Sequence, residues 1–309
     1  MKIFISGASG LLGSHLIHQA ISNGIEVCAN YRTLTKRNYL FHHKDHPLVS
    51  LYPFDLTQED DFPEIKGVDA VINCAALASS QSSDEVQMRL VNIQAAKNLF
   101  NWTAKNNIKK FVQISSSAAI KDTQNSIRST AYAQTKFEID QWLKDQDSTE
   151  VTTIYPGYML GAWDARPSSG SVFFALRLKK FSSYIDNTKN FVAASDVASC
   201  VIETIKQNQS GDFKVGGVNI KISEFLNVFS EITSQAITYI TSFPENTPIE
   251  ELNLNEKEYP LISEFCDTRA LDDERTRSTI GYRHKKDVEY MIRETLEYFE
   301  KERMLRFKK

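Results

Sequence analysis

The stretch "KIFISGASGLLGSHL" (residues 2–16) carries an apolar run into three glycines and then into a second apolar run. Gly7, Gly10 and Gly13 have the spacing GxxGxxG. Glycines here let the backbone turn sharply and approach a pyrophosphate, and a following helix offers unpaired N–H groups to the phosphates. Turns collect glycine for other reasons too, but a strand before the motif and a helix after it favour a dinucleotide site.

The pattern that continues from this stretch alternates short apolar runs with helical periods. Alternation of this kind is typical of parallel strands joined by helical crossovers, with helices on both faces of the sheet. We therefore predict an α/β fold with a Rossmann-type, doubly wound parallel sheet. The expected strands are 2–6, 25–31, 48–53, 69–73, 110–115 and 150–155, and the expected helices are 11–23, 84–105 and 130–145.

The second half of the chain is less regular. Residues 155–170 ("YPGYMLGAWDARPSSG") have the composition of a loop, and the last helix is expected at about 287–303. Its apolar face comprises Val288, Met291, Ile292, Thr295, Leu296 and Phe299. Before it we expect helices at about 195–207 and 222–233 and a strand near 213–216. The predicted division is a dinucleotide-binding domain at 1–155 and a smaller, mainly substrate-binding subdomain at 156–309, with about 191–220 returning to the Rossmann core.

Composition excludes several classes of protein. Of the 309 residues, 41% are hydrophobic, which is enough for a sizeable core. The formal net charge of −3 gives no general basic field for nucleic acid. We expect a cytoplasmic protein without membrane or nucleic-acid partners, because no signal-peptide layout and no long apolar segment is present. The four cysteines are widely spaced and form no CxxC pair, so they predict free thiols.

The end of the second strand indicates which dinucleotide is bound. Sites for NAD usually have an acidic residue there, which holds the ribose 2′-hydroxyl. Residues 27–37 ("VCANYRTLTKR") contain no acid, but they contain Arg32, Lys36 and Arg37. A guanidinium pairs well with a 2′-phosphate, so we expect NADP rather than NAD, with Arg32 as the main contact. NAD remains the alternative, as does a solvated basic loop. The nearby "FHHKDH" (41–46) is expected to be a surface loop, and no metal site is predicted.

A candidate catalytic group follows the fifth strand. Tyr132 and Lys136 are four residues apart on a predicted helix, so their side chains project from one face. A phenol with a pKa near ~10 exchanges protons poorly at neutral pH, and a nearby ammonium favours its anion. A serine from "SSS" (115–117) is placed to bond a substrate carbonyl. The alternative is an ordinary amphipathic helix with a surface lysine.

These motifs together resemble the extended short-chain dehydrogenase/reductase superfamily, of the NAD-dependent epimerase/dehydratase type, over nearly the whole chain. The matching segments are "GASGLLG" (7–13), "FDL" (54–56), "NCAAL" (73–77), "VNIQAAKNL" (91–99), "YPGYMLG" (155–161), "NFVAASDVA" (190–198), "VGGVNIKISEF" (215–225) and "GYRHKKDVEYMIRETLEYF" (281–299). In this family Gly-Thr is usual where Ala95 and Ala96 stand, and arginine is common where Tyr155 stands.

The resemblance implies roles for individual residues. Tyr132 would be the acid/base, Lys136 would bind the ribose and tune Tyr132, and Ser116, the middle of the three serines, would orient the carbonyl. The implied cofactor contacts are Gly7, Ser9, Gly10, Leu11, Leu12, Gly13, Arg32, Asp55, Leu56, Cys74, Ala75, Ala76, Asn92, Tyr132, Lys136 and Pro156.

Within the superfamily the chain most resembles the dihydroflavonol-reductase-like branch, on "GAWDARPSSG" (161–170). Relatives that act on nucleotide sugars usually have Tyr-Gly after the serine and an arginine at the position of Asn190, and both are absent here. We therefore expect an NADPH-dependent oxidoreductase that reduces a small aldehyde or ketone. Tyr158, Trp163 and Phe173 are expected to line the substrate or to pack.

Two alternatives remain open. One is a sugar or nucleotide-sugar epimerase or dehydratase that retains its cofactor, and the other is a non-catalytic NADP sensor. The Tyr-Lys pair argues against the sensor. The resemblance permits a monomer or a homodimer.

Overall fold

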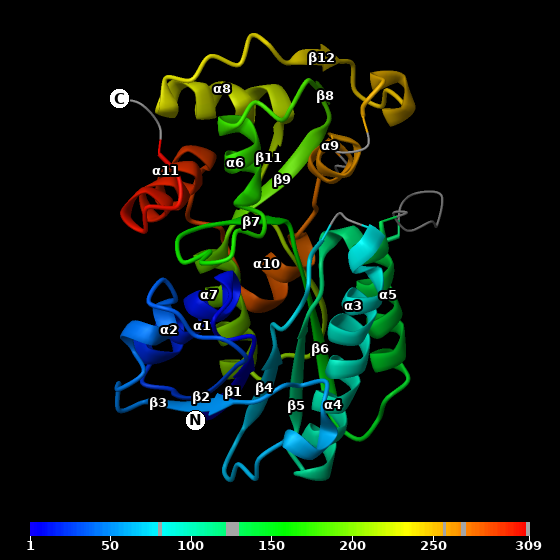
Figure 1. Cartoon of the computed structure of the whole chain (residues 1–309). Helices are drawn as coiled ribbons and strands as arrows, with labels where there is room; N and C mark the ends of the chain where they lie inside the picture. Colours follow the sequence, from blue (N-terminus) through cyan, green and yellow to red (C-terminus); the bar gives the residue numbers. More distant parts are fainter. Residues whose placement is uncertain (80–81, 122–129, 256–257, 267–269, 307–309) are drawn as a thin grey trace.

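A seven-stranded sheet forms the centre of one half of the molecule (Figure 1). The computed structural model describes residues 1–79, 82–121, 130–255, 258–266 and 270–306. The strand order is β10-β6-β5-β4-β1-β2-β3, and every neighbouring pair is parallel. The strands are β1 (Lys2–Ser6), β2 (Glu26–Tyr31), β3 (Val49–Pro53), β4 (Ala70–Asn73), β5 (Lys110–Ile114), β6 (Glu150–Pro156) and β10 (Gly211–Val215). The predicted doubly wound α/β fold is confirmed.

Helices cover both faces of this sheet because alternate strand residues point to opposite sides. In β1, Ile3 and Ile5 belong to the core beneath α1 and α7, whereas Phe4 belongs to the core beneath α4 and α5. Figure 1 shows α3, α4 and α5 together on one side. The helices are α1 (Leu11–Ser22), α2 (Tyr39–His42), α3 (Glu85–Arg89), α4 (Ala95–Lys105), α5 (Ala131–Lys144) and α7 (Ala194–Lys206), with the π-helical turn η3 (Leu90–Gln94) joining α3 to α4.

The other half of the molecule has its own core. Two small sheets lie in it, with the strand orders β11-β9-β7 and β12-β8. Stacked phenylalanines fill the centre, with the rings of Phe191 and Phe225 4.4 Å apart. The strands are β7 (Tyr158–Leu160), β8 (Ser183–Ile185), β9 (Thr188–Ala193), β11 (Val218–Lys221) and β12 (Thr241–Phe243), and the helices are α6 (Ser171–Arg177), α8 (Ile222–Thr233), α9 (Glu258–Cys266), α10 (Glu274–Ile280) and α11 (Val288–Lys301). Short 3₁₀ turns complete the chain: η1 (Glu59–Asp61), η2 (Ser82–Asp84), η4 (Ser117–Ala119) and η5 (Ile249–Leu252).

Most elements predicted from the sequence are confirmed within a residue or two. The apolar face predicted for the last helix is buried in α11. The prediction that residues 155–170 form only a loop is wrong, because β6 extends to Pro156 and β7 follows it. β7 has only three residues, and its pairing partner β9 lies about 30 residues further along the chain, so no local pattern marked it.

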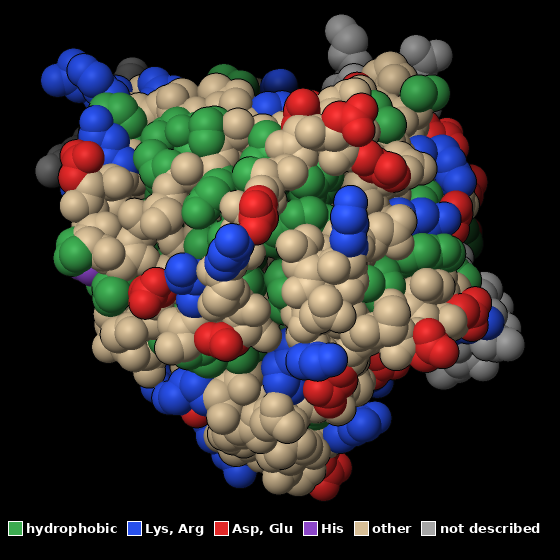
Figure 2. Space-filling model, turned by 90° about the horizontal axis from the view of Figure 1, so that it is seen from below, with side chains coloured by type: hydrophobic (Ala, Val, Ile, Leu, Met, Phe, Trp, Pro, Cys, Tyr) green, Lys and Arg blue, Asp and Glu red, His purple; other side chains and the backbone are tan. Residues whose placement is uncertain are grey.

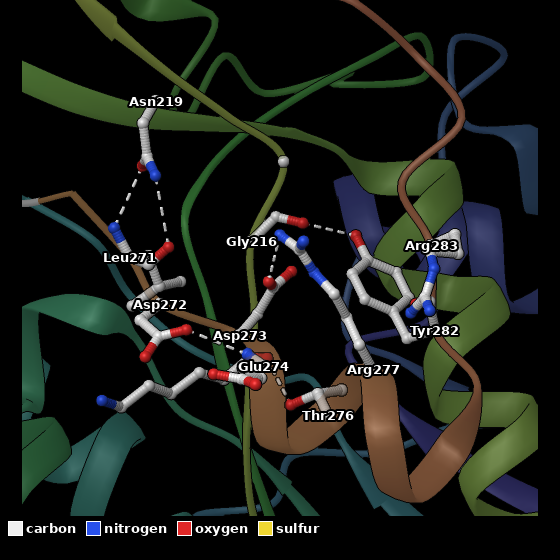
Figure 3. A network of polar contacts seen from close by, with 12 residues as sticks. Gly216, Asn219, Leu271, Asp272, Asp273, Glu274, Thr276, Arg277, Tyr282 and Arg283 are labelled. Atoms are coloured by element: carbon white, nitrogen blue, oxygen red, sulfur yellow. Dashed lines mark hydrogen bonds and ion pairs between the residues drawn. The ribbon is translucent and has the colours of Figure 1, made fainter.

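The chain returns from the second half to the large sheet. β10 pairs with β6 at the sheet edge, and α7 shares its apolar core with α1. Figure 3 shows how the segment around α10 is fastened to β10 and β11. Tyr282 Oη donates to the carbonyl of Gly216 at 2.6 Å, Thr276 Oγ1 donates to that of Lys214 at 2.6 Å, and the main-chain N–H of Leu271 donates to Asn219 at 3.0 Å. The predicted boundary between residues 155 and 156 stays a prediction.

The surface and the thiols complete the description. Figure 2 shows Lys and Arg side chains interspersed with Asp and Glu on the face it presents. Across the described residues, no helix combines the length and the apolar character needed to cross a membrane. All four cysteines are free, as predicted.

Candidate active site

The glycine turn after β1 leaves a cradle that a side chain would fill. Gly7 adopts a left-handed conformation (φ 63°), and the N–H of Gly10 donates to its carbonyl at 2.9 Å. A Cβ at Gly7 would lie 2.9 Å from the main-chain N of Ala75, and one at Gly13 would overlap the carbonyl of Gly7. α1 begins directly after Gly10 and has no acidic residue in its first turn. Its first N–H groups are therefore available to an anion, and the turn fits a pyrophosphate.

Buried polar groups hold the ends of β1 and β4 beside this turn. Ser6 Oγ donates to Asn73 Oδ1 at 2.6 Å, and it accepts the main-chain N–H of Cys74 at 3.1 Å and of Ala75 at 3.2 Å. The bond to Asn73 is buried and the other two are part-buried, so loss of the Ser6 hydroxyl would leave polar groups unpaired in the interior. These bonds hold Cys74 and Ala75, two of the predicted cofactor residues, next to Gly7.

The remaining predicted cofactor residues lie along the same edge of the sheet, since the carboxyl ends of parallel strands meet there. Asp55 follows β3, and its Oδ1 accepts both the main-chain N–H and the hydroxyl of Thr57 at 2.9 Å. Leu56 beside it is buried, Ala76 is exposed after β4, and Pro156 is buried at the end of β6.

The basic loop after β2 folds back over the glycine turn. Arg32 directly follows β2 and is exposed. Asn38 Nδ2 donates to the carbonyl of Ser9 at 2.8 Å, which ties the two loops together. Tyr298 on α11 donates its hydroxyl to the carbonyl of Arg37 at 2.7 Å. The loop is thus held at Arg37 by Tyr298 and at Asn38 by Ser9. The contact from Tyr298 had no signal in the sequence, because 261 residues separate the two partners.

Asn92 joins the turn η3, the chain after β4 and helix α5 through its side-chain hydrogen bonds. It lies in the π-helical turn η3, is buried, and accepts the N–H of Leu77 at 2.8 Å. Its Nδ2 donates to the carbonyl of Leu77 and to Thr135 Oγ1, both at 3.0 Å. π-helical turns are rare and are frequent at functional sites. Asn92 therefore fixes the chain after β4 to α5, the helix that bears the predicted catalytic pair.

Tyr132 and Lys136 lie one turn apart on α5. The Thr130 hydroxyl caps this helix by accepting the N–H of Ala133 at 3.3 Å. Lys136 is only 2% exposed, and its Nζ donates to the carbonyl of Ile114 at the end of β5 at 2.8 Å. Burial lowers the pKa of Lys136 to about 8, while the negative charge of ionised Asp140 acts in the opposite direction. Tyr132 is half-buried in the first turn of α5.

The three serines after β5 have different surroundings. Ser115 is buried, and its hydroxyl donates to Asp140 Oδ2 at 2.5 Å. Ser116 is half-buried and caps η4, because its Oγ accepts the N–H of Ala118 at 3.1 Å. Ser117 is half-buried and begins η4. Ser115 is thus committed to Asp140, whereas Ser116 and Ser117 are half-buried.

Sequence reasoning missed Asp140, which is buried one turn after Lys136 on α5. The spacing of Tyr132, Lys136 and Asp140 at intervals of four was a signal that places all three on one helix face. Burial raises the pKa of Asp140 to about 7, although the bond from Ser115 and the charge of Lys136 lower it.

The three aromatic residues predicted to line a substrate or to pack show mainly packing. Phe173 is fully buried and stacks on Phe229 at 5.8 Å, so it is a core residue. The ring of Trp163 lies 4.5 Å from that of His15 and 4.3 Å from that of Tyr39. Tyr158 is half-buried, and its hydroxyl donates to the carbonyl of Ser169 at 2.8 Å.

The histidines predicted to be surface residues lie in and after α2. His42 is exposed, and His43 stacks on Tyr39 with the rings 3.9 Å apart. Within the described ranges, no group of three or more His, Cys, Asp or Glu side chains is placed to hold a metal ion.

Comparisons with known proteins identify the family and the fold. The profile of the NAD dependent epimerase/dehydratase family matches residues 3–216, which is more than half of the chain. A sterol-4-alpha-carboxylate 3-dehydrogenase (decarboxylating) of Dictyostelium discoideum is 34% identical over 128 residues, 40% of this chain and 38% of that protein. A Synechocystis protein provisionally assigned as a dihydroflavonol 4-reductase is 23% identical over 250 residues, 74% of this chain and 72% of that protein.

Solved structures show the same fold at low sequence identity. The UDP-glucose 4-epimerase of Thermus thermophilus, in complex with NAD, superimposes with a TM-score of 0.75 at 20% identity, over 97% of this chain and 99% of that one. The structure of gox2253 superimposes with a TM-score of 0.80 at 17% identity, over 98% and 99% of the two chains.

Proposed function

The chain belongs to the NAD dependent epimerase/dehydratase family, whose members are NAD(P)-dependent enzymes of the extended short-chain dehydrogenase/reductase type. We propose that it is an NADPH-dependent reductase of an aldehyde or ketone group in a small molecule. The observation that carries this proposal is the pair on α5. Lys136 is buried against the end of β5, and Tyr132 lies one turn before it on the same helix. A bare YxxxK spacing on a surface helix would leave the ammonium in solvent, whereas here it is buried and donates to the carbonyl of Ile114.

The residues of the site divide the reaction between them. When bound, the dinucleotide supplies or accepts a hydride at its nicotinamide ring. Tyr132 gives a proton to the carbonyl oxygen, and the ammonium of Lys136 favours the phenolate that remains. Ser116 accepts a main-chain N–H, so its own hydroxyl hydrogen stays available to donate to the same oxygen. The reverse sequence oxidises an alcohol.

The preference for NADPH rests on the loop after β2. This loop contains Arg32, Lys36 and Arg37, and its Asn38 bonds Ser9 of the glycine turn, which supports the preference. A 2′-phosphate on the ribose would meet cations there. Residues 27–37 contain no Asp or Glu, so this segment has no carboxylate that would repel the phosphate. NAD lacks that phosphate and gains nothing from these charges.

The names of the relatives support oxidoreduction of a carbon-bound oxygen. One relative is called a sterol-4-alpha-carboxylate 3-dehydrogenase, and another is provisionally called a dihydroflavonol 4-reductase, so both names denote oxidoreductases. In this chain Asn190, at a position where nucleotide-sugar enzymes commonly have arginine, is buried and bonds Gly217 at 3.0 Å and Asn219 at 2.7 Å. That asparagine offers no charge to a diphosphate.

The test is a panel of aldehydes, ketones and nucleotide sugars, each assayed with NADPH and with NADH. We expect the 340 nm absorbance to fall in step with the alcohol formed from an aldehyde or ketone, faster with NADPH. An epimerase that retains its cofactor would convert a sugar without any change in bulk absorbance, and that result would replace the proposal.

Two variants assign the proton donor. Tyr132→Phe removes the phenol hydroxyl and is expected to lower kcat by about 10²–10⁴-fold while NADPH binding is retained. Tyr259→Phe changes an exposed tyrosine on α9 and is the matched control. Wild-type turnover by Tyr132→Phe would show that another group donates the proton.

A further inference from the structure

The charge of Lys136 is buried, and its hydrogen bond does not neutralise it. The acceptor of that bond is the main-chain carbonyl of Ile114, which is a neutral dipole. Removing an ammonium from water is unfavourable by several kcal/mol in general, and a nearby carboxylate offsets part of that penalty. The side chain therefore needs a negative charge close by if it is to remain protonated at the pH of the reaction.

Asp140 supplies that charge from the same helix. It lies one turn after Lys136, so the two side chains leave α5 on one face, and it is 1% exposed. Its Oδ2 accepts the hydroxyl of Ser115. Its Oδ1 has no hydrogen-bond partner among the residues that the structure describes. The carboxylate raises the pKa of Lys136, and the ammonium lowers that of Asp140, so each group favours the charged form of the other.

Other titratable groups face this pair from the neighbouring elements. Tyr155 on β6 feels the charge of Asp140, and burial together with that charge raises the pKa of its phenol. Asp212 on β10 raises the pKa of Asp140, and Lys144 on α5 lowers it. Tyr155, Asp212 and Lys144 also line a cavity of about 560 Å³ between α5, β10 and the start of α10. Asp140 is thus electrostatically coupled to residues that line this cavity.

We propose that Asp140 is a positioning residue whose carboxylate, held by Ser115, keeps the buried side chain of Lys136 protonated and in place beside Tyr132. This inference rests on the proposed function, because it assigns Asp140 and Ser115 the role of supporting the Tyr132–Lys136 pair. Burial raises the pKa of Asp140 to about 7, so its carboxyl group ionises as the pH rises through neutrality and is charged at mildly alkaline pH, where Lys136 would otherwise lose its proton.

The first test is Asp140→Asn, which keeps the shape of the side chain and removes its charge. We expect Lys136 to lose its proton more readily, so the alkaline limb of the kcat–pH profile moves to lower pH by about one unit. Turnover at pH 6 is expected to recover toward the wild-type value. Asp145→Asn, an exposed acid at the end of the same helix, is the matched control and leaves the profile unchanged.

A second readout needs neither cofactor nor substrate. The side-chain ¹³Cε signal of Lys136, assigned with Lys136→Arg, reports its titration in the free protein. We expect its midpoint to fall in Asp140→Asn and to fall by less in Ser115→Ala, which retains the carboxylate but loses its hydrogen bond. Asp140→Glu keeps the charge and is expected to restore a midpoint close to wild type.

The outcomes separate this inference from the proposed function. If no carbonyl compound is reduced, the proposed function fails, while the titration of Lys136 still tests the role of Asp140. If the Lys136 midpoint is the same in Asp140→Asn and the wild type, or if kcat falls equally at every pH, Asp140 has only a structural role and the inference is overturned. If Asp140→Asn does not fold, the inference is overturned instead by a Lys136 titration midpoint in Ser115→Ala that equals the wild-type value.

Discussion

Gly7→Ala tests the glycine cradle most directly, because Gly24 provides a matched control. Both residues have nearly the same left-handed conformation, with φ of +63° at Gly7 and +67° at Gly24. Alanine in that conformation costs about 1–2 kcal/mol at either position. The two sites differ only in their surroundings: a Cβ at Gly24 meets nothing within 4 Å, whereas a Cβ at Gly7 lies 2.9 Å from the Cα and N of Ala75.

The close approach at Gly7 adds a second penalty. The atoms it meets belong to the main chain after β4, and the bonds from Cys74 and Ala75 to Ser6 hold that chain in place. Overlap with atoms that cannot move away costs about 1–3 kcal/mol more. We therefore expect Gly7→Ala to lower the free energy of unfolding by about 2–5 kcal/mol and Gly24→Ala by about 1–2 kcal/mol.

The assay combines guanidinium unfolding with titration of NADPH. Gly7→Ala is expected to unfold at a lower denaturant concentration than Gly24→Ala and to bind NADPH at least about ten-fold more weakly, which is about 1.4 kcal/mol. Gly24→Ala is expected to bind NADPH like the wild type. Equal unfolding midpoints would refute the argument from the rigid main chain, and wild-type NADPH affinity in Gly7→Ala would show that the pyrophosphate binds elsewhere.

Three further predictions concern separate parts of the molecule. Arg32→Ala is expected to weaken NADPH binding by about 10–100-fold and to leave NADH binding unchanged, as measured by fluorescence titration. Lys36→Ala is expected to have a smaller effect on NADPH binding. Equal losses of affinity for both cofactors would refute a contact between Arg32 and the 2′-phosphate. Ser116→Ala is expected to lower kcat by about 10²-fold, and Ser117→Ala, assayed alongside, is expected to retain most activity; the reverse order would assign the role to Ser117. Burial raises the pKa of Asp164 from 3.8 to about 6, so its contribution to stability is present at low pH and is lost as the pH rises through about 6. Relative to Asp164→Asn, the wild type should therefore lose up to about 3 kcal/mol of unfolding free energy between pH ~4 and ~7, as measured by urea unfolding at each pH. If the unfolding free energies of the two proteins changed in parallel with pH, the assignment would be contradicted.

The first half of the fold could be predicted because its signals are local. Each of β1 to β6 lies in a short, largely apolar run, and GxxGxxG marks one strand-to-helix turn. Residues that are neighbours in the sequence are therefore enough to place these strands and this turn. β8 and β12 show the opposite case. They have three residues each, and Ser183 pairs with Thr241 across a long intervening segment, so neither strand has a pattern of its own.

The candidate site divides in the same way. The four-residue spacing of Tyr132 and Lys136 is enough to place them on one helix face, because a helix repeats every 3.6 residues. The choice among three consecutive serines was not available from spacing, because adjacent residues leave the chain in different directions. Only the packing of α5 against β5 shows that Ser115 bonds Asp140 and that Ser116 and Ser117 remain half-buried.

The sequence by itself determined the alternating α/β pattern, the glycine turn and the Tyr-Lys pair, since hydrophobic period and glycine spacing act over a few residues. The tertiary structure alone decided that Lys136 is buried beside Asp140 and that Tyr298 holds the basic loop near Ser9. The reason is physical. Burial and charge compensation depend on which distant segments pack together, and that is a property of the whole core rather than of any one stretch of chain.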